Sequence, residues 1–306
     1  RSKSPYGPYE WKRVLERGKT TMNGPHQGGW IHTKYGEDWF IHFQDKGPYG
    51  RVCHLQPVDW SSGWPVMGNA GEPYWKFRKP KSDSKTIVNP VETDEFDSSK
   101  LGMQWQWQND YKESYGQATS MGFFRLFTYA LPELGDVSNL WYVPNMLLQK
   151  TPADEFTATT KLSFCSRNSD QYVGLVCMSA EYSSVGLQRT EDGYELQIRH
   201  NPNAMRTHLT DEVLTVDTLK PTQKGTPRKG RPAEMHIKDV YLRMSIKDSK
   251  VNYAYSIDGK KWKKAGGEYA MGKGRWIGSK IGFFAVDPNK TGRKGFIDID
   301  WFRISR

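Results

Sequence analysis

Residues 23–67 read NGPHQGGWIHTKYGEDWFIHFQDKGPYGRVCHLQPVDWSSGWPVM, and the spacing of their apolar and turn residues indicates the fold class. Residues 39–44 alternate between two faces, which is the period of two that is typical of a β-strand. A Gly/Pro loop at 46–50 leads into a second alternating segment at 51–56. The stretch therefore predicts a meander of short antiparallel strands, at the close spacing of a propeller blade.

Strand patterns also dominate the chain from residue 93 onward, without a convincing helical period. Asp192-Gly193 and Asp258-Gly259 each lie between two strand-like segments, which is the strongest short signal for a β-hairpin. About a dozen strands in this region predict a two-sheet sandwich of the jelly-roll type. The clearest predicted strands cover residues 123–129, 156–165, 172–178, 185–189, 194–199, 240–246, 251–256, 281–286 and 296–304.

Composition agrees with an all-β protein of two modules. The chain has 306 residues, 13% of them aromatic, with 29 Gly and 17 Pro, which implies many tight turns. No apolar run approaches the roughly 20 residues needed to cross a bilayer, so no membrane partner is expected. The formal net charge is +10, and much of the excess lies in the segment KPTQKGTPRKGR at 220–231. We interpret that segment as a solvated surface loop, because no nucleic-acid-binding motif accompanies it.

Cysteines and histidines show no ligand spacing. Cys53, Cys165 and Cys177 are an odd number and lie in apolar or alternating segments, where small buried side chains are expected. His32, His42, His54, His200, His208 and His236 form no motif such as HExxH, and a structural role is favoured for them.

Several long motifs resemble glycoside hydrolase family 43. In the first half these are PHQGGW at 25–30, WFIHFQD at 39–45, GRVCHLQPVDW at 50–60 and GWPV at 63–66, and RSKSPYGPYE at 1–10 is similar to an outer-strand phrase of that family. In the second half they are DEFDSSKLGMQWQW at 94–107, LWYVPNMLLQKTPADEFTATTKL at 140–162 and GFIDIDWFRIS at 295–305. The most similar subgroup comprises the β-xylosidases and α-L-arabinofuranosidases with a C-terminal concanavalin-like sandwich.

The resemblance implies a domain organisation. Residues 1–75 are expected to form the final blade or blades of a five-bladed catalytic β-propeller, residues 76–92 a linker and residues 93–306 a β-sandwich accessory domain. Tyr74 and Trp75, directly before residues 76–92, indicate that the linker packs along a surface.

The resemblance also implies a mechanism whose main residues are not in this chain. Members resemble inverting glycosidases, in which two carboxyl groups stand about 6.5–9.5 Å apart as general acid and general base. Those carboxylates and a third, orienting one are expected upstream of Arg1, because Glu10, Glu37, Asp38, Asp45 and Asp59 match no catalytic motif. The chain alone is therefore predicted to be inactive, and no cofactor is required for the chemistry.

Four residues of the first half are carried over from the resemblance. Arg51 matches an active-site arginine, whose guanidinium donates paired hydrogen bonds to sugar hydroxyls and lowers the pKa of a neighbouring carboxylate. His26 matches a histidine that contacts a cation at the propeller axis, directly or through water. Gln27 and Gln44 are weaker candidates for the same pocket. An exposed arginine beside a turn and a structural histidine are the alternatives.

A calcium site in the sandwich is a further hypothesis. Asp97, with Asp94 and Glu95, lies at the start of the sandwich, and Asp300, with Asp298, lies near its end. Because first and last strands often pair in such folds, oxygen ligands from both ends suit Ca²⁺. Solvated acids at strand ends are the alternative. Trp105 and Trp107 are either core residues, which we favour, or an exposed platform for stacking sugars.

Two classes of function follow. The first is an exo-acting glycosidase on xylan-derived oligosaccharides, either a β-xylosidase or an α-L-arabinofuranosidase. It would need the missing propeller blades, supplied by a separate chain or by an upstream part of the polypeptide. The second is a non-catalytic carbohydrate-binding or scaffold module. For the first, a secreted or periplasmic location is expected.

Overall fold

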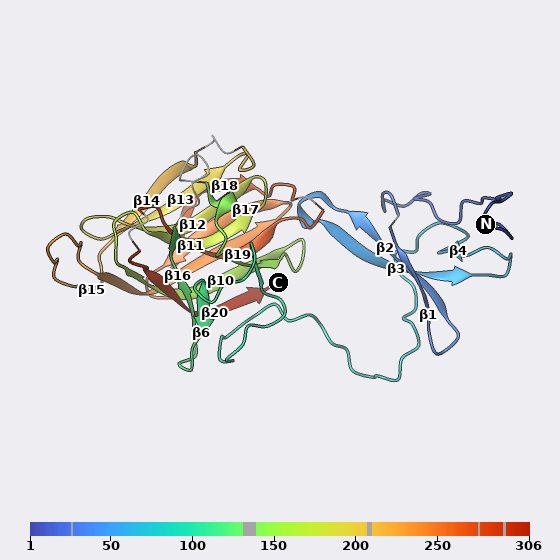
Figure 1. Cartoon of the computed structure of the whole chain (residues 1–306), viewed down its shortest axis with the longest axis horizontal. Coiled ribbons are helices and arrows are strands. Elements are labelled where there is room, and N and C mark those ends of the chain that lie inside the picture. Colours follow the sequence, from blue (N-terminus) through green and yellow to red (C-terminus); the bar gives the residue numbers. More distant parts are fainter. Residues whose placement is uncertain (26, 131–138, 207–209, 275, 290–291) are drawn as a thin grey trace. The chain divides into compact units, whose positions relative to one another are not determined.

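The computed structural model describes residues 1–25, 27–130, 139–206, 210–274, 276–289 and 292–306. Almost all of its regular structure is β-strand, and its contacts divide the chain into an N-terminal unit, Arg1–Asn89, and a C-terminal unit, Pro90–Arg306 (Figure 1). The all-β fold class predicted from sequence is confirmed.

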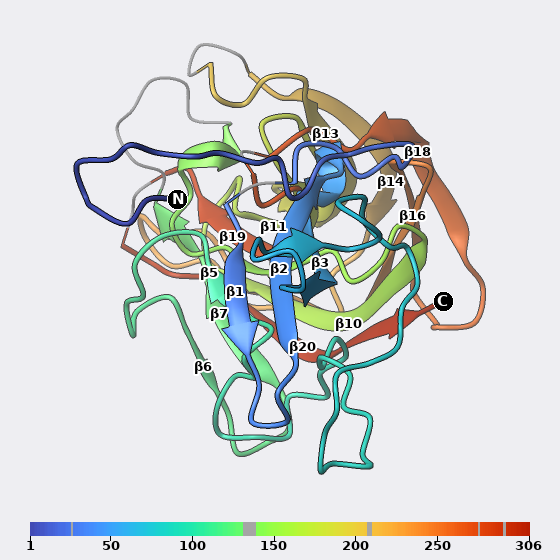
Figure 2. The same ribbon diagram turned by 90° about the vertical axis from the view of Figure 1, so that its right-hand side faces the viewer.

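The N-terminal unit contains one antiparallel sheet of four strands. In order these are β1 (Gly29–His32), β2 (Asp38–Asp45), β3 (Arg51–Asp59) and β4 (Val66–Met67), each paired with the next. Figure 2 shows β1, β2 and β3 side by side. The predicted meander is confirmed, and its four consecutive strands are consistent with one propeller blade.

The two faces of this sheet differ in an unexpected way. His42, Gln44 and Gln56 lie on one face and are buried, although they are polar. Gln56 satisfies both its amide groups on the backbone of Tyr74, accepting from its nitrogen at 2.7 Å and donating to its carbonyl at 3.3 Å. On the opposite face Ile41 is 40% exposed. These polar side chains are covered by the chain's own residues, whereas Ile41 on the other face stays in contact with solvent, although Trp39 on that face is buried.

The chain just before and within the predicted linker packs against the N-terminal unit. Trp75 packs edge-on against His54, with ring centroids 5.9 Å apart. Further along, Arg78 pairs with Glu37 at 2.5 Å, and the backbone nitrogen of Lys81 donates to the same carboxylate at 2.8 Å. Segment 74–81 is thus attached to the N-terminal unit. The predicted domain bounds stay predictions.

The C-terminal unit is a sandwich of two sheets (Figure 1). The first sheet has the order β18-β17-β16-β10-β20-β7-β6, with β15 added beside β16; the second has the order β14-β13-β12-β11-β19-β9-β5, with β8 added parallel to β19. The strands of the first sheet are β6 (Gly116–Ala118), β7 (Phe124–Phe127), β10 (Phe156–Ser166), β15 (Gln223–Lys224), β16 (Met235–Lys247), β17 (Lys250–Ser256), β18 (Lys263–Ala270) and β20 (Phe296–Ser305). Those of the second are β5 (Gln106–Trp107), β8 (Tyr129–Ala130), β9 (Leu147–Lys150), β11 (Tyr172–Met178), β12 (Tyr182–Arg189), β13 (Tyr194–Asn201), β14 (Glu212–Leu219) and β19 (Lys280–Asp287).

The interior of the sandwich is filled by large apolar side chains from both sheets. Trp105 is 8% exposed and stacks on Phe96, with ring centroids 5.7 Å apart. It also packs edge-on against Phe302, with ring centroids 5.3 Å apart. Trp107 is half-buried, and its ring centroid lies 5.6 Å from that of Tyr115. The core position favoured for Trp105 is therefore observed. Two short 3₁₀ helices, Gly47–Tyr49 and Leu140–Tyr142, complete the regular structure of the described residues.

The segment at 220–231 differs from the expected loop. Gln223 and Lys224 form β15 and pair with β16, and Arg228 makes an isolated bridge to Arg231. The side chains stay exposed along most of the segment. β16 extends beyond its pairing with β17 at this end, so a polar segment can pair with its backbone there without burying apolar surface.

Candidate functional site

Arg51 opens β3 directly after a tight turn. Gly47 and Gly50 adopt φ values of 60° and 75°, which glycine tolerates without strain, and so bring the chain back beside β2. One guanidinium nitrogen of Arg51, Nη1, donates to Oε1 of Gln27 at 3.2 Å. Its central carbon lies 4.2 Å from the ring centroid of Phe43. The ring and the glutamine together orient the guanidinium.

The loop that carries Gln27 is anchored at the same end of the sheet. Asn23 accepts a hydrogen bond from the backbone nitrogen of Asp45 at 2.9 Å and donates to the carbonyl of Asp45 at 3.0 Å. Asp45 is the register partner of Arg51. Arg51 and Gln27, two of the predicted substrate-binding residues, are therefore brought together by the structure.

Gln44 lies on the opposite face of β2. Its Nε2 donates to the carbonyl of Thr21 at 2.9 Å, and its Oε1 lies 3.1 Å from Nε2 of His54. The ring of His54 stacks on that of His42, with centroids 5.5 Å apart. Burial lowers the pKa of both imidazoles, and for His54 the neighbouring His42 and Lys46 lower it further. Gln44 is thus separated from the Arg51–Gln27 pair and helps to hold an uncharged polar cluster.

The carboxylates of the N-terminal unit are engaged locally. Asp38 accepts from the indole nitrogen of Trp30 at 2.8 Å, and its Oδ1 lies 2.8 Å from Nδ1 of His32; its pKa is lowered mainly by His32. The pKa of Glu37 is lowered, first by the backbone nitrogen of Lys81. That of Asp59 is lowered by hydrogen bonds from Ser61. A general acid needs a raised pKa, so these three carboxylates are unsuited to that role.

The predicted calcium ligands lie in the C-terminal unit, and Asp300 pairs with Lys161 at 2.9 Å. Asp97 is exposed. Within the described residues, neither belongs to a group of three metal-ligating side chains. The neighbouring acids are also paired: Asp298 receives two hydrogen bonds from Arg125, at 2.6 and 2.8 Å, and Glu95 two from Arg303, at 2.8 and 2.7 Å. The calcium site stays a prediction. The other predicted metal ligand, His26, lies outside the described residues.

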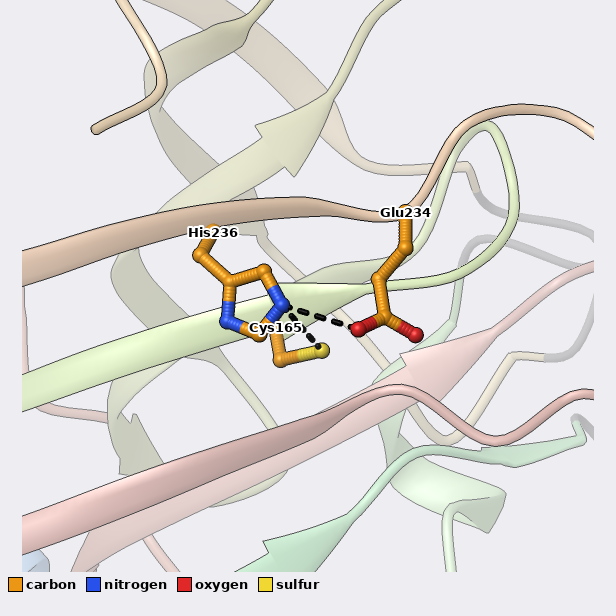
Figure 3. Close-up of side chains that lie close together, drawn as sticks. All are labelled: Cys165, Glu234 and His236. Atoms are coloured by element: carbon orange, nitrogen blue, oxygen red, sulfur yellow. Dashed lines mark hydrogen bonds and ion pairs between the residues drawn. The ribbon is translucent and has the colours of Figure 1, made fainter. Parts of the chain in front are cut away.

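One group of metal-ligating side chains was not indicated by the sequence. Cys165, Glu234 and His236 have ligand atoms that all lie within 4.8 Å of one another (Figure 3). Cys165 lies on β10, whereas Glu234 and His236 lie just before and within β16, so no single local spacing reveals the whole group. The pair Glu234 and His236, two residues apart at the start of a strand, was the available signal.

No helix in the described part of the chain is long and apolar enough to cross a membrane.

Comparisons with known proteins give consistent results. Residues 93–305 match the family model of the β-xylosidase C-terminal concanavalin A-like domain. A putative β-xylosidase of Xylanibacter ruminicola is 32% identical over 289 residues, which cover 92% of this chain and 48% of that protein. A non-reducing end α-L-arabinofuranosidase of Bacteroides ovatus is 25% identical over 272 residues, covering 84% of this chain and 46% of that protein.

Among solved structures, the GH43 protein BlXynB of Bacillus licheniformis superposes with a TM-score of 0.78 at 25% identity, over 99% of this chain and 58% of that one. The chain spans about half the length of the curated relatives it matches.

Proposed function

This chain belongs to the family of β-xylosidase C-terminal concanavalin A-like domains of glycoside hydrolase family 43, and from that premise we propose that it is the C-terminal half of a glycosidase. The substrate class is xylan-derived oligosaccharide, cleaved from the end as a β-xylosidase, an α-L-arabinofuranosidase or both, with inversion. The observation that carries the proposal is the family match over residues 93–305 in a chain about half as long as its relatives.

The surface of the N-terminal unit supports the need for further blades. Ile41 and Leu55 are register partners and are 40% and 37% exposed, and Ile31, on the same face of the meander, is 44% exposed. Edge strands and apolar faces of a single blade are normally covered by its neighbours in a closed propeller. A missing part of the propeller, in the same polypeptide or in a separate chain, is the proposed occupant of this face.

Within that enzyme, the residues of this chain bind and orient. The Arg51 guanidinium is proposed to donate to sugar hydroxyls and to lower the pKa of a carboxylate supplied by the other blades. Gln27 holds the guanidinium through its Oε1, and the Phe43 ring supports it from one side. The general acid and the general base are proposed to lie outside this chain. A secreted or periplasmic location is part of the same proposal.

The test replaces Arg51 in the polypeptide that carries both this chain and the remaining blades. R51A is expected to lower kcat/KM on aryl β-xyloside or aryl α-L-arabinofuranoside by at least about a hundredfold, since losing one preorganised donor at a reacting centre costs about 10²–10³-fold. R51K keeps the positive charge but loses the planar guanidinium that donates paired hydrogen bonds. Its kcat/KM is expected to lie between those of R51A and the parent. The ratio of kcat/KM values for the two aryl substrates identifies the preferred sugar.

R13A is the matched control, because Arg13 is an exposed arginine of the same unit that pairs with Glu16 at 2.6 Å. Near-parental turnover in R51A, with R13A also unaffected, contradicts the assigned role of Arg51. A complete polypeptide that binds xylo-oligosaccharides but releases neither aryl group favours the second function, a non-catalytic carbohydrate-binding module.

A further inference from the structure

The register of the first sheet brings a thiol, an imidazole and a carboxylate to one place in the C-terminal unit. Cys165 on β10 is the direct register partner of His236 on β16. Glu234 precedes His236 by two residues, the spacing at which side chains of an extended chain point to the same side. Figure 3 shows the three side chains converging from these two neighbouring segments.

A bulge sets this alignment. Leu162 pairs with Val240 and Phe164 with Ile237, so two residues of β16, Lys238 and Asp239, lie opposite one residue of β10. Asp239 has φ 56°, and its backbone nitrogen donates to Oγ of Ser163 at 3.3 Å. A bulge re-aims the side chains beside it, and bulges are frequent next to functional sites.

The distances place all three ligand atoms around one point. Nε2 of His236 lies 3.5 Å from Sγ of Cys165 and 2.9 Å from Oε1 of Glu234. The same ring nitrogen thus faces both the sulfur and the oxygen. In a nucleophilic relay the carboxylate instead orients the base through the other ring nitrogen. The geometry therefore disfavours a role for Cys165 as a nucleophile. It favours one bound ion that all three side chains coordinate.

We propose that Cys165, Glu234 and His236 bind a divalent transition-metal ion of the zinc class. Thiolate, imidazole and carboxylate are the three ligand types of Zn²⁺, with bond lengths of about 2.0–2.3 Å. Ligand atoms around a tetrahedral ion of that size lie roughly 3–4 Å from one another, which the two measured separations approach. Hard oxygen-seeking ions such as Ca²⁺ are excluded by the sulfur and nitrogen ligands.

The surroundings of the proposed ion leave its fourth coordination position accessible to solvent. Cys165 and His236 help to line a hollow of about 200 Å³, together with Phe123, Ser163 and Phe296. Cys165 is 2% exposed, whereas the side chain of His236 is 28% exposed. A water molecule from the hollow completes the tetrahedron. The ion links β10 to β16 and stabilises the first sheet.

Arg167 orients the carboxylate. Its Nε donates to Oε2 of Glu234 at 2.8 Å, which leaves Oε1 toward the histidine. Such an outer partner of a metal-binding carboxylate fixes its direction.

The experiment titrates the full chain with Co²⁺ and with Zn²⁺ after treatment with a chelator. C53S serves as the parent, because Cys53 is exposed and would bind metal adventitiously. We expect one equivalent of Co²⁺ to produce a sulfur-to-cobalt charge-transfer band, and Zn²⁺ to abolish it and to raise the unfolding temperature, reversibly with chelator. C165A removes the band. E234Q is expected to weaken the affinity for Co²⁺ by at least about tenfold. Loss of a residue that merely orients a metal ligand already costs about that much, and Glu234 is itself a proposed ligand.

H200Q is the matched control. His200 also lies between carboxylates, with Glu181 at 3.2 Å and Glu212 at 3.0 Å, but within the described residues it belongs to no group of three metal-ligating side chains. It is expected to keep the band and the affinity. Should C165A fold poorly, E234Q still decides, because the Glu234 side chain is 40% exposed. Absence of a thiolate band, or equal affinity in E234Q and the C53S parent, overturns the proposal.

Discussion

At the scale of single residues, buried thiols and phenols couple the stability of the C-terminal unit to pH. Cys177 on β11 is 2% exposed, and burial raises its pKa from about 9 to about 12. Burial likewise raises the pKa of Tyr172, on the same strand, to about 12. The thiol and the phenol therefore stay protonated in the folded chain at pH values at which the same groups have lost their protons in the unfolded chain. Stability is complete below about pH 9 and declines as the pH rises toward 12.

C177A tests this coupling. The variant lacks the titrating thiol, so its cost in free energy of unfolding is expected to be smaller at about pH 10.5 than at about pH 8 by about 2 kcal/mol, at about 1.4 kcal/mol per pH unit. Urea unfolding at the two pH values measures it. V176A, at a neighbouring position that is fully buried but does not titrate, is expected to cost the same at both. A pH-independent cost for C177A contradicts the assignment.

At the scale of elements, close approach of β11 and β12 depends on a pair of glycines. Gly174 and Gly186 are register partners. A methyl group on Gly174 would lie 2.2 Å from the carbonyl oxygen of Val185, and one on Gly186 would lie 2.3 Å from that of Val173. Because these clashes are with backbone atoms, side-chain movement cannot relieve them. The two strands must separate to accept any larger residue.

G174A is therefore expected to destabilise the chain by about 1–3 kcal/mol, the usual cost of overpacking a core. G267A on β18 is the control, since nothing lies within 4 Å of its added methyl group, and it is expected to change stability by less than about 0.5 kcal/mol. Denaturant midpoints of both variants measure the difference. Equal effects at the two positions would refute the steric explanation.

Most of the strands that the sequence pattern did not indicate lie at sheet edges, namely β5, β6, β14 and β18. Eight of the nine predicted strands are present as single strands, and the ninth, 123–129, is divided into β7 and β8. β9 and β15 were also not predicted. β14 is largely exposed, and β18 reads KKAGGEYA. An edge strand is recruited by backbone hydrogen bonds to its neighbour and needs little apolar alternation of its own.

At the scale of the whole molecule, the two units differ in how completely they bury their apolar surface. The C-terminal unit has two eight-stranded sheets and a shared core, including Leu140, Met146 and Phe284. The N-terminal unit has one four-stranded sheet, and one face of that sheet leaves Ile31, Ile41 and Leu55 partly exposed. A single sheet with one uncovered face is marginal in water, whereas a two-layer sandwich supplies its own core.

A chain divided between Asn89 and Pro90 makes this difference measurable. Residues 90–306 are expected to unfold in one cooperative thermal transition, because both sheets and their core lie within that segment. Residues 1–89 alone are expected to bind a hydrophobic dye and to associate, since apolar side chains stay uncovered. A non-cooperative 90–306 fragment, or a monomeric 1–89 fragment that binds no dye, contradicts the expectation.

The sequence by itself determined the all-β class, the meander, most strands of the sandwich and the family, because period-two alternation, Asp-Gly hairpins and long motifs are local properties of the chain. Only the tertiary structure decided that Arg51 meets Gln27 while Gln44 faces the other side of β2, and that Cys165, Glu234 and His236 converge. These contacts depend on strand register and on a bulge, and a shift of one residue would turn every side chain to the opposite face.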